Sequence, residues 1–302
     1  MPHLPLQDPP ALPWAAVLAA REHAAAARLP FCVAHAGQAL RAGSVARAHL
    51  PALAAWPEAL HIDARAVTLT TPADARSSTL ARINRQLLRD GLLRAWRDET
   101  YPLLPTSGDG PLLATLERAA ARFWGTLTLG AHCNGYIADA QGQPSHLWIA
   151  RRALGKAVDP GLLDNLIGGG VPWGQTPAAA LLREGWEEAG LRPAQMQGLR
   201  PGRRLTVLRD VPEGLQHEQV HSYDLALPAG LLPVNQDGEV HSFTLMPVAQ
   251  ALAQAAAGHM TVDATLVTLD FALRHRLLPA DHHQHLRALS DGLWCGTARL
   301  DH

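Results

Sequence analysis

Several kinds of sequence signal are scarce in this chain of 302 residues. It has only three cysteines, Cys32, Cys133 and Cys295, which lie far apart and form no C-x-x-C pair. We therefore expect reduced thiols, and neither a disulfide framework nor a zinc site. No apolar run is long enough to span a bilayer, and Met1–Pro13 has no basic segment ahead of an apolar core. These absences predict a cytoplasmic protein that does not insert into a membrane.

Neither sign of charge prevails, because 26 Lys and Arg face 27 Asp and Glu, for a net charge of −1. This balance argues against a dedicated nucleic-acid or membrane-surface protein. It leaves small charged substrates open, since these need only a local patch of charge. Hydrophobic residues make up 47% of the chain, which is ample for a folded core.

The chain is long enough for two domains. Its clearest cluster of breaker residues is Pro105–Pro111, so we expect a smaller α+β domain at 1–110 and a second domain at 111–302. In and after the first domain, helices are predicted at Pro13–Leu29, Ser77–Leu93 and Leu112–Phe123, and short strands at Phe31–Ala36 and Val67–Thr70.

The second domain alternates strand and helix patterns, which predicts an α+β fold with a mixed sheet and not a doubly wound parallel one. Strands are predicted at Thr126–Ile137, His146–Arg151, Arg204–Arg209, Val220–Leu227 and Val240–Met246. Helices are predicted at Pro177–Ala189, Val248–Ala257, Asp263–Leu277 and Asp281–Leu293.

The segment Leu166–Leu191 concentrates the residues that indicate chemistry. Thr176 is a favourable N-cap, Pro177 is favoured at the first helical position, and Gly190 is a helix stop. Local rules alone therefore predict a helix over Pro177–Ala189.

Three glutamates of this helix, Glu184, Glu187 and Glu188, share one face at about 100° per residue, opposite an apolar stripe. Like charges this close repel each other, and the helix C-terminus disfavours negative charge. A bound cation would offset both costs, and Mg²⁺ fits because it prefers oxygen ligands and bridges carboxylates to phosphate oxygens. The alternative is a solvated acidic face on which Arg183 pairs with Glu187.

A glycine loop, Gly168–Gly170, precedes the helix and would let the backbone approach a metal or a phosphate closely. Together the two features resemble the Nudix signature G-x5-E-x7-R-E-U-x-E-E-x-G-U, in which U is bulky and apolar. The matching positions are Gly169, Arg183, Glu184, Glu187, Glu188, Gly190 and Leu191. Two positions depart: Gln175 stands where the signature has Glu, and Gly185 stands where it has an apolar residue.

The resemblance to the Nudix hydrolase superfamily implies an α/β/α sandwich with a mixed sheet, and Mg²⁺-dependent cleavage of a diphosphate linkage, with Mn²⁺ as an alternative ion. It implies that Glu184, Glu187 and Glu188 ligate or manage the metal together with the Gly169 carbonyl, and that Arg183 belongs to the same catalytic set. Gln175 removes one acidic group, which weakens metal binding or only alters how Arg183 is held.

The remaining candidates surround this core of the site. Either Glu184 or Glu239 qualifies as the general base, although Glu239 also fits a solvated turn. Arg151, Arg152 and Lys156 precede the glycines and suit phosphate binding, as does the Gly170 backbone, and the alternative for the three cations is ordinary surface charge.

Further segments resemble one Nudix subgroup, the proteins related to thiamine pyrophosphokinase that carry an additional, DUF4743-like N-terminal domain. They are LWIARRALGKAVDPGLLDNLIGGG, LRPGRR, DLALP, NQDGEV and the N-terminal WRDETYP. This resemblance implies a small-molecule substrate, thiamine diphosphate or its oxidised oxy and oxo analogues, cleaved to the monophosphate. Two alternatives stay open: hydrolysis of another nucleoside diphosphate-X compound, and a Nudix protein that only binds a diphosphate. A homodimer is also left open.

Two rival chemistries have weaker support. The run His217–His221 matches the zinc-protease pattern H-E-x-x-H, which requires a helix, but the alternation that follows it predicts a strand. Isopentenyl diphosphate isomerase shares the Nudix fold and would need a catalytic cysteine, but the surroundings of Cys133 do not match.

Overall fold

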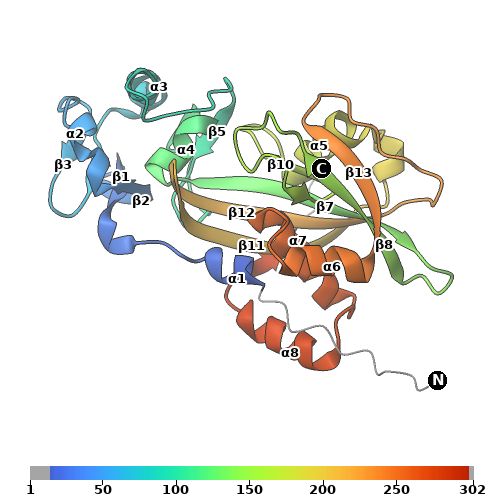
Figure 1. Ribbon diagram of the computed structural model, residues 1–302. Coiled ribbons are helices and arrows are strands. Elements are labelled where there is room, and N and C mark those ends of the chain that lie inside the picture. Colours follow the sequence, from blue (N-terminus) through green and yellow to red (C-terminus); the bar gives the residue numbers. More distant parts are fainter. Residues whose placement is uncertain (1–13, 299–302) are drawn as a thin grey trace.

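The computed structural model describes residues 14–298. The segment Met1–Pro13, in which no targeting signal was found, lies outside the described residues. Two groups of elements lie side by side, with the N-terminal elements at one end and a large sheet between helical layers at the other (Figure 1). Within the described part of the chain, no helix is long and apolar enough to cross a membrane.

The N-terminal elements are built around a four-stranded sheet of order β2-β1-β4-β3, in which β1 and β4 are parallel. Their buried side chains form one hydrophobic core that runs from Leu29 to Trp124. The elements are β1 (Arg28–His35), β2 (Gln38–Ala46), α2 (Leu50–Leu53), β3 (Leu60–Ile62), β4 (Val67–Leu69), α3 (Arg76–Arg89), β5 (Thr100–Leu103), β6 (Ala114–Glu117) and α4 (Arg118–Trp124). Helix α1 (Ala15–Ala19) precedes them but packs into the core of the large C-terminal sheet. Short 3-10 turns lie at Ala25–Ala27, Arg47–His49 and Ala73–Ala75.

The C-terminal elements surround a mixed sheet of order β13-β8-β7-β12-β11-β14, with β10 paired to β7 and β9 to β8. The strands are β7 (Leu127–Ala138), β8 (Pro144–Arg152), β9 (Leu163–Asp164), β10 (Ile167–Gly170), β11 (Arg200–Val211), β12 (Gly214–Ala226), β13 (Val240–Pro247) and β14 (Trp294–Thr297). The helices are α5 (Pro177–Ala189), α6 (Val248–Ala256), α7 (Val262–Arg274) and α8 (Ala280–Leu289), with a 3-10 turn at Pro193–Met196.

This sheet is covered on both faces. Helix α5 packs on one face, and α6 and α7 pack on the other (Figure 1). Successive residues of β8 serve different cores, because Leu147 and Ile149 face α6 and α7 while Trp148 faces the α5 side. The predicted α+β fold, an α/β/α sandwich with a mixed sheet behind an N-terminal α+β region, is confirmed.

Two predicted helices are wrong in extent. Alanine-rich Pro13–Leu29 was predicted to be helical throughout, but α1 covers only Ala15–Ala19 and the chain enters β1 at Arg28. The segment predicted as a helix at Leu112–Phe123 begins with strand β6, which pairs with β5, and turns into α4 only at Arg118. In both places strand pairing and core packing override a high intrinsic helix propensity.

The junction between the two groups is close-packed. A Cβ atom added at Gly214, the first residue of β12, would collide with the carbonyl oxygen of Arg122 in α4. Residues 113–124 pack into the N-terminal core, beyond the breaker cluster at Pro105–Pro111. The division into 1–110 and 111–302 stays a prediction.

Candidate active site

Helix α5 has the predicted limits, because its ends are fixed locally. The Thr176 hydroxyl accepts a hydrogen bond from the Ala179 amide at 3.2 Å, and Gly190 ends the helix with φ 66°. The departure from the signature at Gly185 has a packing reason, since a Cβ atom there would lie 2.5 Å from the Met196 sulfur. The helix can therefore lie close to the 3-10 turn behind it.

The three glutamates of α5 have different surroundings. Glu188 is buried, and its carboxylate accepts a hydrogen bond from the Gly168 amide at 2.9 Å. Glu184 accepts a hydrogen bond from Arg183 Nη2 at 2.8 Å, and Glu187 accepts one from Arg183 Nη1 at 2.5 Å. Arg183 thus holds Glu187 on the outer part of the face, away from Glu188.

Burial raises the pKa of both inner carboxyls. For Glu188 the desolvation is reinforced by the neighbouring Glu184 and opposed by the Gly168 amide and Lys156. For Glu184 the desolvation is opposed by the ion pair with Arg183. Two partly desolvated carboxylates side by side favour an additional cation between them.

The three glycines ahead of the helix form strand β10, whereas a loop was predicted. They pair with the start of β7, and each leaves room for a neighbouring side chain. A Cβ atom at Gly168 would lie 2.7 Å from the His132 ring, and one at Gly169 would collide with the Glu184 carboxylate. A Cβ atom at Gly170 would collide with the Tyr101 hydroxyl. The absence of side chains at these positions lets Glu184 lie directly against the strand.

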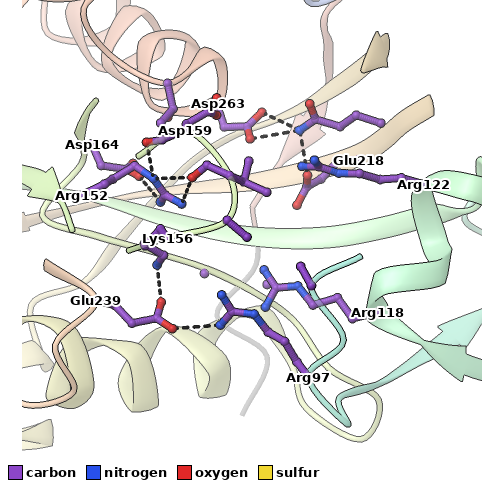
Figure 2. A pocket seen from close by; sticks show the side chains of 18 of the residues that line it. Arg97, Arg118, Arg122, Arg152, Lys156, Asp159, Asp164, Glu218, Glu239 and Asp263 are labelled. Atoms are coloured by element: carbon purple, nitrogen blue, oxygen red, sulfur yellow. Dashed lines mark hydrogen bonds and ion pairs between the residues drawn. The ribbon is translucent and has the colours of Figure 1, made fainter. Parts of the chain in front are cut away.

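A cavity of about 340 Å³ opens in front of β10. Figure 2 shows charged side chains of both signs pointing into it from several elements. It is lined by Gly168, Gly169, Gly170 and Glu184, together with Arg152, Lys156 and Glu239. Arginines from the N-terminal elements complete the lining: Arg94, Arg97, Arg118 and Arg122.

Lys156 and Glu239 meet at the centre of this cavity. Lys156 Nζ pairs with the Glu239 carboxylate and lies 4.0 Å from Glu188 Oε1. Glu239 also accepts a hydrogen bond from Arg97 Nη1 at 2.9 Å (Figure 2). These two cations overcome the desolvation of Glu239 and lower its pKa to about 2.

Arg151 and Arg152 lie on opposite sides of β8, and only Arg152 lines the cavity. Arg152 Nη1 donates to Asp164 at 2.9 Å, and its other nitrogens donate to the carbonyls of Val158 and Asp159. Arg151 is exposed, donates to the Gly161 carbonyl and does not line the cavity, and its role in substrate binding stays a prediction.

The site has suitable donors for a divalent cation, although they are not a preformed cage. Among residues 14–298, no group of three or more His, Cys, Asp or Glu side chains is arranged to hold a metal ion. Two desolvated carboxylates, Glu184 and Glu188, lie against the backbone of Gly168 and Gly169. Mg²⁺ in enzymes is held by one or two carboxylates plus substrate phosphates, so this donor set fits Mg²⁺ that arrives with a diphosphate.

The back of the cavity holds a second acidic cluster. Gln216 donates hydrogen bonds to Glu218 at 3.0 Å and to Asp263 at 3.1 Å. Burial and the neighbouring Asp263 raise the pKa of Glu218. Glu218 belongs to the His217–His221 run, which lies within strand β12, so the helix that a zinc protease requires is absent from this run. Cys133 is fully buried in β7 and does not line the cavity.

Sequence reasoning missed the residues that reach the site from distant segments. The four N-terminal arginines come from a loop and from α4, and no local spacing relates them to β10 or α5. The one available signal was the segment Trp96–Pro102, which contains Arg97 and was noted only as part of a family resemblance.

Comparisons with known proteins agree with this geometry. The family model described as NUDIX domain matches residues 130–266, and the one described as Domain of unknown function (DUF4743) matches residues 12–128. Residues 130–266 are a Nudix domain. They contain β10, α5 and every acidic residue of the cavity lining.

Two curated plant proteins are similar to this chain over about two thirds or more of its length. The chain is 36% identical to Nudix hydrolase 20, chloroplastic, of Arabidopsis thaliana over 72% of this chain and 58% of that protein. It is 34% identical to Nudix hydrolase 24, chloroplastic, of the same plant over 68% of this chain and 56% of that protein. The chain thus spans less than two thirds of the length of both relatives.

Among solved structures, a Deinococcus radiodurans protein, DR0079, matches 57% of this chain and 99% of its own length. The sequence identity is 22% and the TM-score is 0.45.

Proposed function

We propose that this protein is a Nudix pyrophosphohydrolase that cleaves a diphosphate linkage with a divalent cation, Mg²⁺ in the first place and Mn²⁺ as an alternative. The observation that carries the proposal is the pair of desolvated carboxylates, Glu184 and Glu188, packed against glycine strand β10: Glu184 lines the charged cavity, and Glu188 lies behind the lining, 4.0 Å from Lys156 Nζ. The bound metal would neutralise the diphosphate and activate a water molecule.

We assign the metal-binding and phosphate-binding roles to separate residues of the site. Glu184 and Glu188, with the Gly169 carbonyl, would hold the metal. Arg183 orients Glu184, and Glu187 would join the metal set only after release from Arg183. Arg152 and Lys156 line the cavity and would face the substrate phosphates, whereas the exposed Arg151 does not line it.

Glu184 suits the role of general base better than Glu239. A base works best when its pKa lies near the operating pH, and burial raises the pKa of Glu184 in the metal-free protein, so as a base Glu184 would act while its carboxylate is not bound to the metal. Glu239 is engaged by Lys156 and Arg97, which lower its pKa to about 2, so it would accept a proton poorly. Glu239 instead holds the two cations in the cavity.

For the substrate we propose thiamine diphosphate or its oxidised analogues, supported by the resemblance of several segments to Nudix proteins related to thiamine pyrophosphokinase. No Phe, Tyr or Trp side chain is among the described residues that line the cavity, and His132 is the one lining residue with an aromatic ring, so we expect recognition to rest mainly on the diphosphate. That lining is equally suited to another nucleoside diphosphate-X compound, which is the second candidate.

A substrate screen tests the proposal, with detection of inorganic phosphate for the thiamine diphosphates and chromatographic detection of the monophosphate products for the other compounds, whose cleavage releases no inorganic phosphate. Purified protein with Mg²⁺ or Mn²⁺ is offered thiamine diphosphate, oxythiamine diphosphate, nucleoside diphosphate sugars and dinucleotides, beside Glu184→Gln as the inactive control. We expect release of phosphate from the thiamine compounds and its loss in the variant. Turnover of ADP-ribose or a dinucleotide alone would replace the thiamine proposal, and binding without turnover of any compound would show a non-catalytic diphosphate-binding protein.

A further inference from the structure

The charges of the cavity lining are segregated by their position in the chain. The lining residues before position 130 are four arginines and two alanines, with no carboxylate among them. All acidic residues of the lining come from position 159 onward. A diphosphate with its metal needs both signs, because the metal requires carboxylates and the remaining phosphate oxygens require cations.

The cations of the Nudix domain that line the cavity are already committed to neighbours. Arg152 is bound by Asp164 and by the carbonyls of Val158 and Asp159. Lys156 pairs with Glu239 and lies next to Glu188. Neither cation can bind a phosphate without giving up a partner, so the domain that would hold the metal has no uncommitted positive charge at the cavity.

Among the described residues, Arg94 is the uncommitted one of the four N-terminal arginines, because Arg97 pairs with Glu239, Arg118 with Glu99 and Arg122 with Glu213. Arg94 is exposed at the rim of the cavity and has no hydrogen bond or ion pair with any residue of the described chain. Arg97 reaches further in and contacts Glu239, and 39% of its side chain is exposed. Arginine binds phosphate with two parallel N–H groups and stays charged at any relevant pH.

The loop that carries these two arginines is held in an unusual conformation. Ala95 and Asp98, on either side of Trp96 and Arg97, have φ of 56° and 57° in the left-handed region, which costs energy at non-glycine residues. Trp96 packs on the N-terminal core and donates a hydrogen bond to Asp98 at 2.7 Å. The Arg97 amide donates to Glu117, the residue that caps α4. The fold therefore fixes this loop despite the local strain.

The N-terminal wall is also fixed against the Nudix strand that forms the cavity floor. The Trp173 amide donates to the Thr100 carbonyl at 2.8 Å. The buried Tyr101 hydroxyl has no hydrogen-bond partner and occupies the space that a side chain at Gly170 would need. The arginines of α4 and of the loop thus have a defined position relative to β10.

We propose that the N-terminal domain is part of the substrate site, and that Arg94 and Arg97 bind the phosphate oxygens of the diphosphate across the cavity from the Nudix carboxylates. Arg118 and Arg122 also line the cavity, but each is already paired with a glutamate, Glu99 and Glu213 respectively. This inference rests on the proposed function, because it concerns the same diphosphate substrate. It names the residues that would bind the phosphate oxygens that are not bound by the metal and the Nudix carboxylates.

Binding of inorganic pyrophosphate, measured by calorimetry in buffer with EDTA, tests the inference without metal and without turnover. The full-length protein is compared with Arg94→Gln, Arg97→Gln and Arg94→Lys. The matched control is Arg85→Gln, an exposed arginine of α3 outside the cavity. Thermal melting verifies that each variant is folded.

We expect Arg94→Gln and Arg97→Gln to weaken pyrophosphate binding about tenfold or more, as for the loss of a charge-assisted hydrogen bond. Arg94→Lys should bind with intermediate affinity, since it keeps the charge and loses the two-pronged contact. With a substrate found by the screen, KM should rise by a similar factor while kcat stays within about threefold.

The outcomes separate the two proposals. Arginine-dependent binding of pyrophosphate by a protein that hydrolyses no diphosphate would remove the hydrolase function and leave the inference intact. Hydrolysis with the KM of Arg94→Gln and Arg97→Gln equal to that of Arg85→Gln would overturn the inference alone. A protein that neither binds pyrophosphate nor hydrolyses any diphosphate would overturn both.

Discussion

The cavity has two walls, an acidic wall and a basic wall, which differ in charge and in the part of the chain that forms them. The acidic wall belongs to the Nudix domain: Glu184 comes from the capped helix α5, and Glu218 and Glu239 come from β12 and from the turn before β13. The basic wall belongs to the N-terminal elements, and its arginines come from a loop and a short helix. The difference agrees with the proposal that a metal diphosphate is bound between the two walls, because the Nudix cations at the cavity, Arg152 and Lys156, are already paired with Asp164 and Glu239.

The largest expected effect concerns the acidic wall. Glu188→Gln keeps the size of the side chain and removes the charge from the most buried carboxylate of α5. If this wall holds the metal, kcat should fall by about 10²-fold or more, which corresponds to roughly 3 kcal/mol of the barrier. Steady-state kinetics with the substrate from the screen provide the measurement.

The same variant should not be less stable than the native protein. Burial raises the pKa of Glu188, so its ionised form is disfavoured in the folded state at neutral pH, and a neutral amide removes that cost. Glu58→Gln, at an exposed turn of the N-terminal part, is the matched control with unchanged kinetics. Activity of Glu188→Gln within threefold of native would contradict this prediction, because it would show that the carboxylates of the acidic wall do not hold the metal.

The two walls also differ in how far sequence could predict them. The limits of α5 follow from Thr176, Pro177 and Gly190, which act within one helical turn, so local rules found them residue by residue. The arginines of the basic wall reach the site only through the contact between Tyr101 and Gly170 and through the loop around Trp96. Such contacts join residues that are far apart in the sequence, so no local pattern or periodicity of the sequence reveals them.

The errors in the predicted secondary structure also arise from contacts that are distant in sequence. The glycines Gly168–Gly170 suggested a loop, because sequence does not reveal that His132, Glu184 and Tyr101 occupy the space next to a strand. The alanine-rich helix before β1 was overestimated for a related reason: propensity is local, whereas strand pairing is decided by distant residues.

A smaller effect is expected where the walls meet, at Glu239. Lys156 and Arg97 lower its pKa to about 2, below the value near 4.5 that an unperturbed glutamate has. A carboxyl with a depressed folded-state pKa stabilises the fold above its unfolded pKa, and this stability is lost as pH falls from about 4.5 towards 2. Because the side chain is 33% exposed, solvent screening limits the effect to about 1 kcal/mol.

Urea unfolding of Glu239→Gln and of native protein, across this pH range, measures that contribution. The variant should be less stable at pH 7, and the difference should shrink as the pH approaches 2, whereas Glu58→Gln should show no such trend. The activity of Glu239→Gln should fall less than tenfold. A loss of activity of 10² to 10⁴, as for removal of a general base, would instead identify Glu239 as the base. The base would then lie where the two walls meet.

The smallest effect is expected at the position that departs from the signature. Gln175 is exposed, does not line the cavity, and follows a turn in which its amide donates to the Pro172 carbonyl. Arg183 is already held by Glu184 and Glu187, so it needs no further carboxylate. An added exposed charge contributes up to about 1 kcal/mol, a factor of about five, and at this distance from the cavity we expect less than threefold in kcat/KM for Gln175→Glu.

The matched control is Gln141→Glu, which adds the same charge at the exposed turn between β7 and β8. Equal kinetics for both variants and the native protein would mean that the acidic wall is complete without the signature glutamate. A tenfold gain in kcat/KM or in Mg²⁺ affinity for Gln175→Glu alone would mean the opposite. The acidic wall would then be short of one carboxylate, and the excess of arginine across the cavity would be what compensates for it.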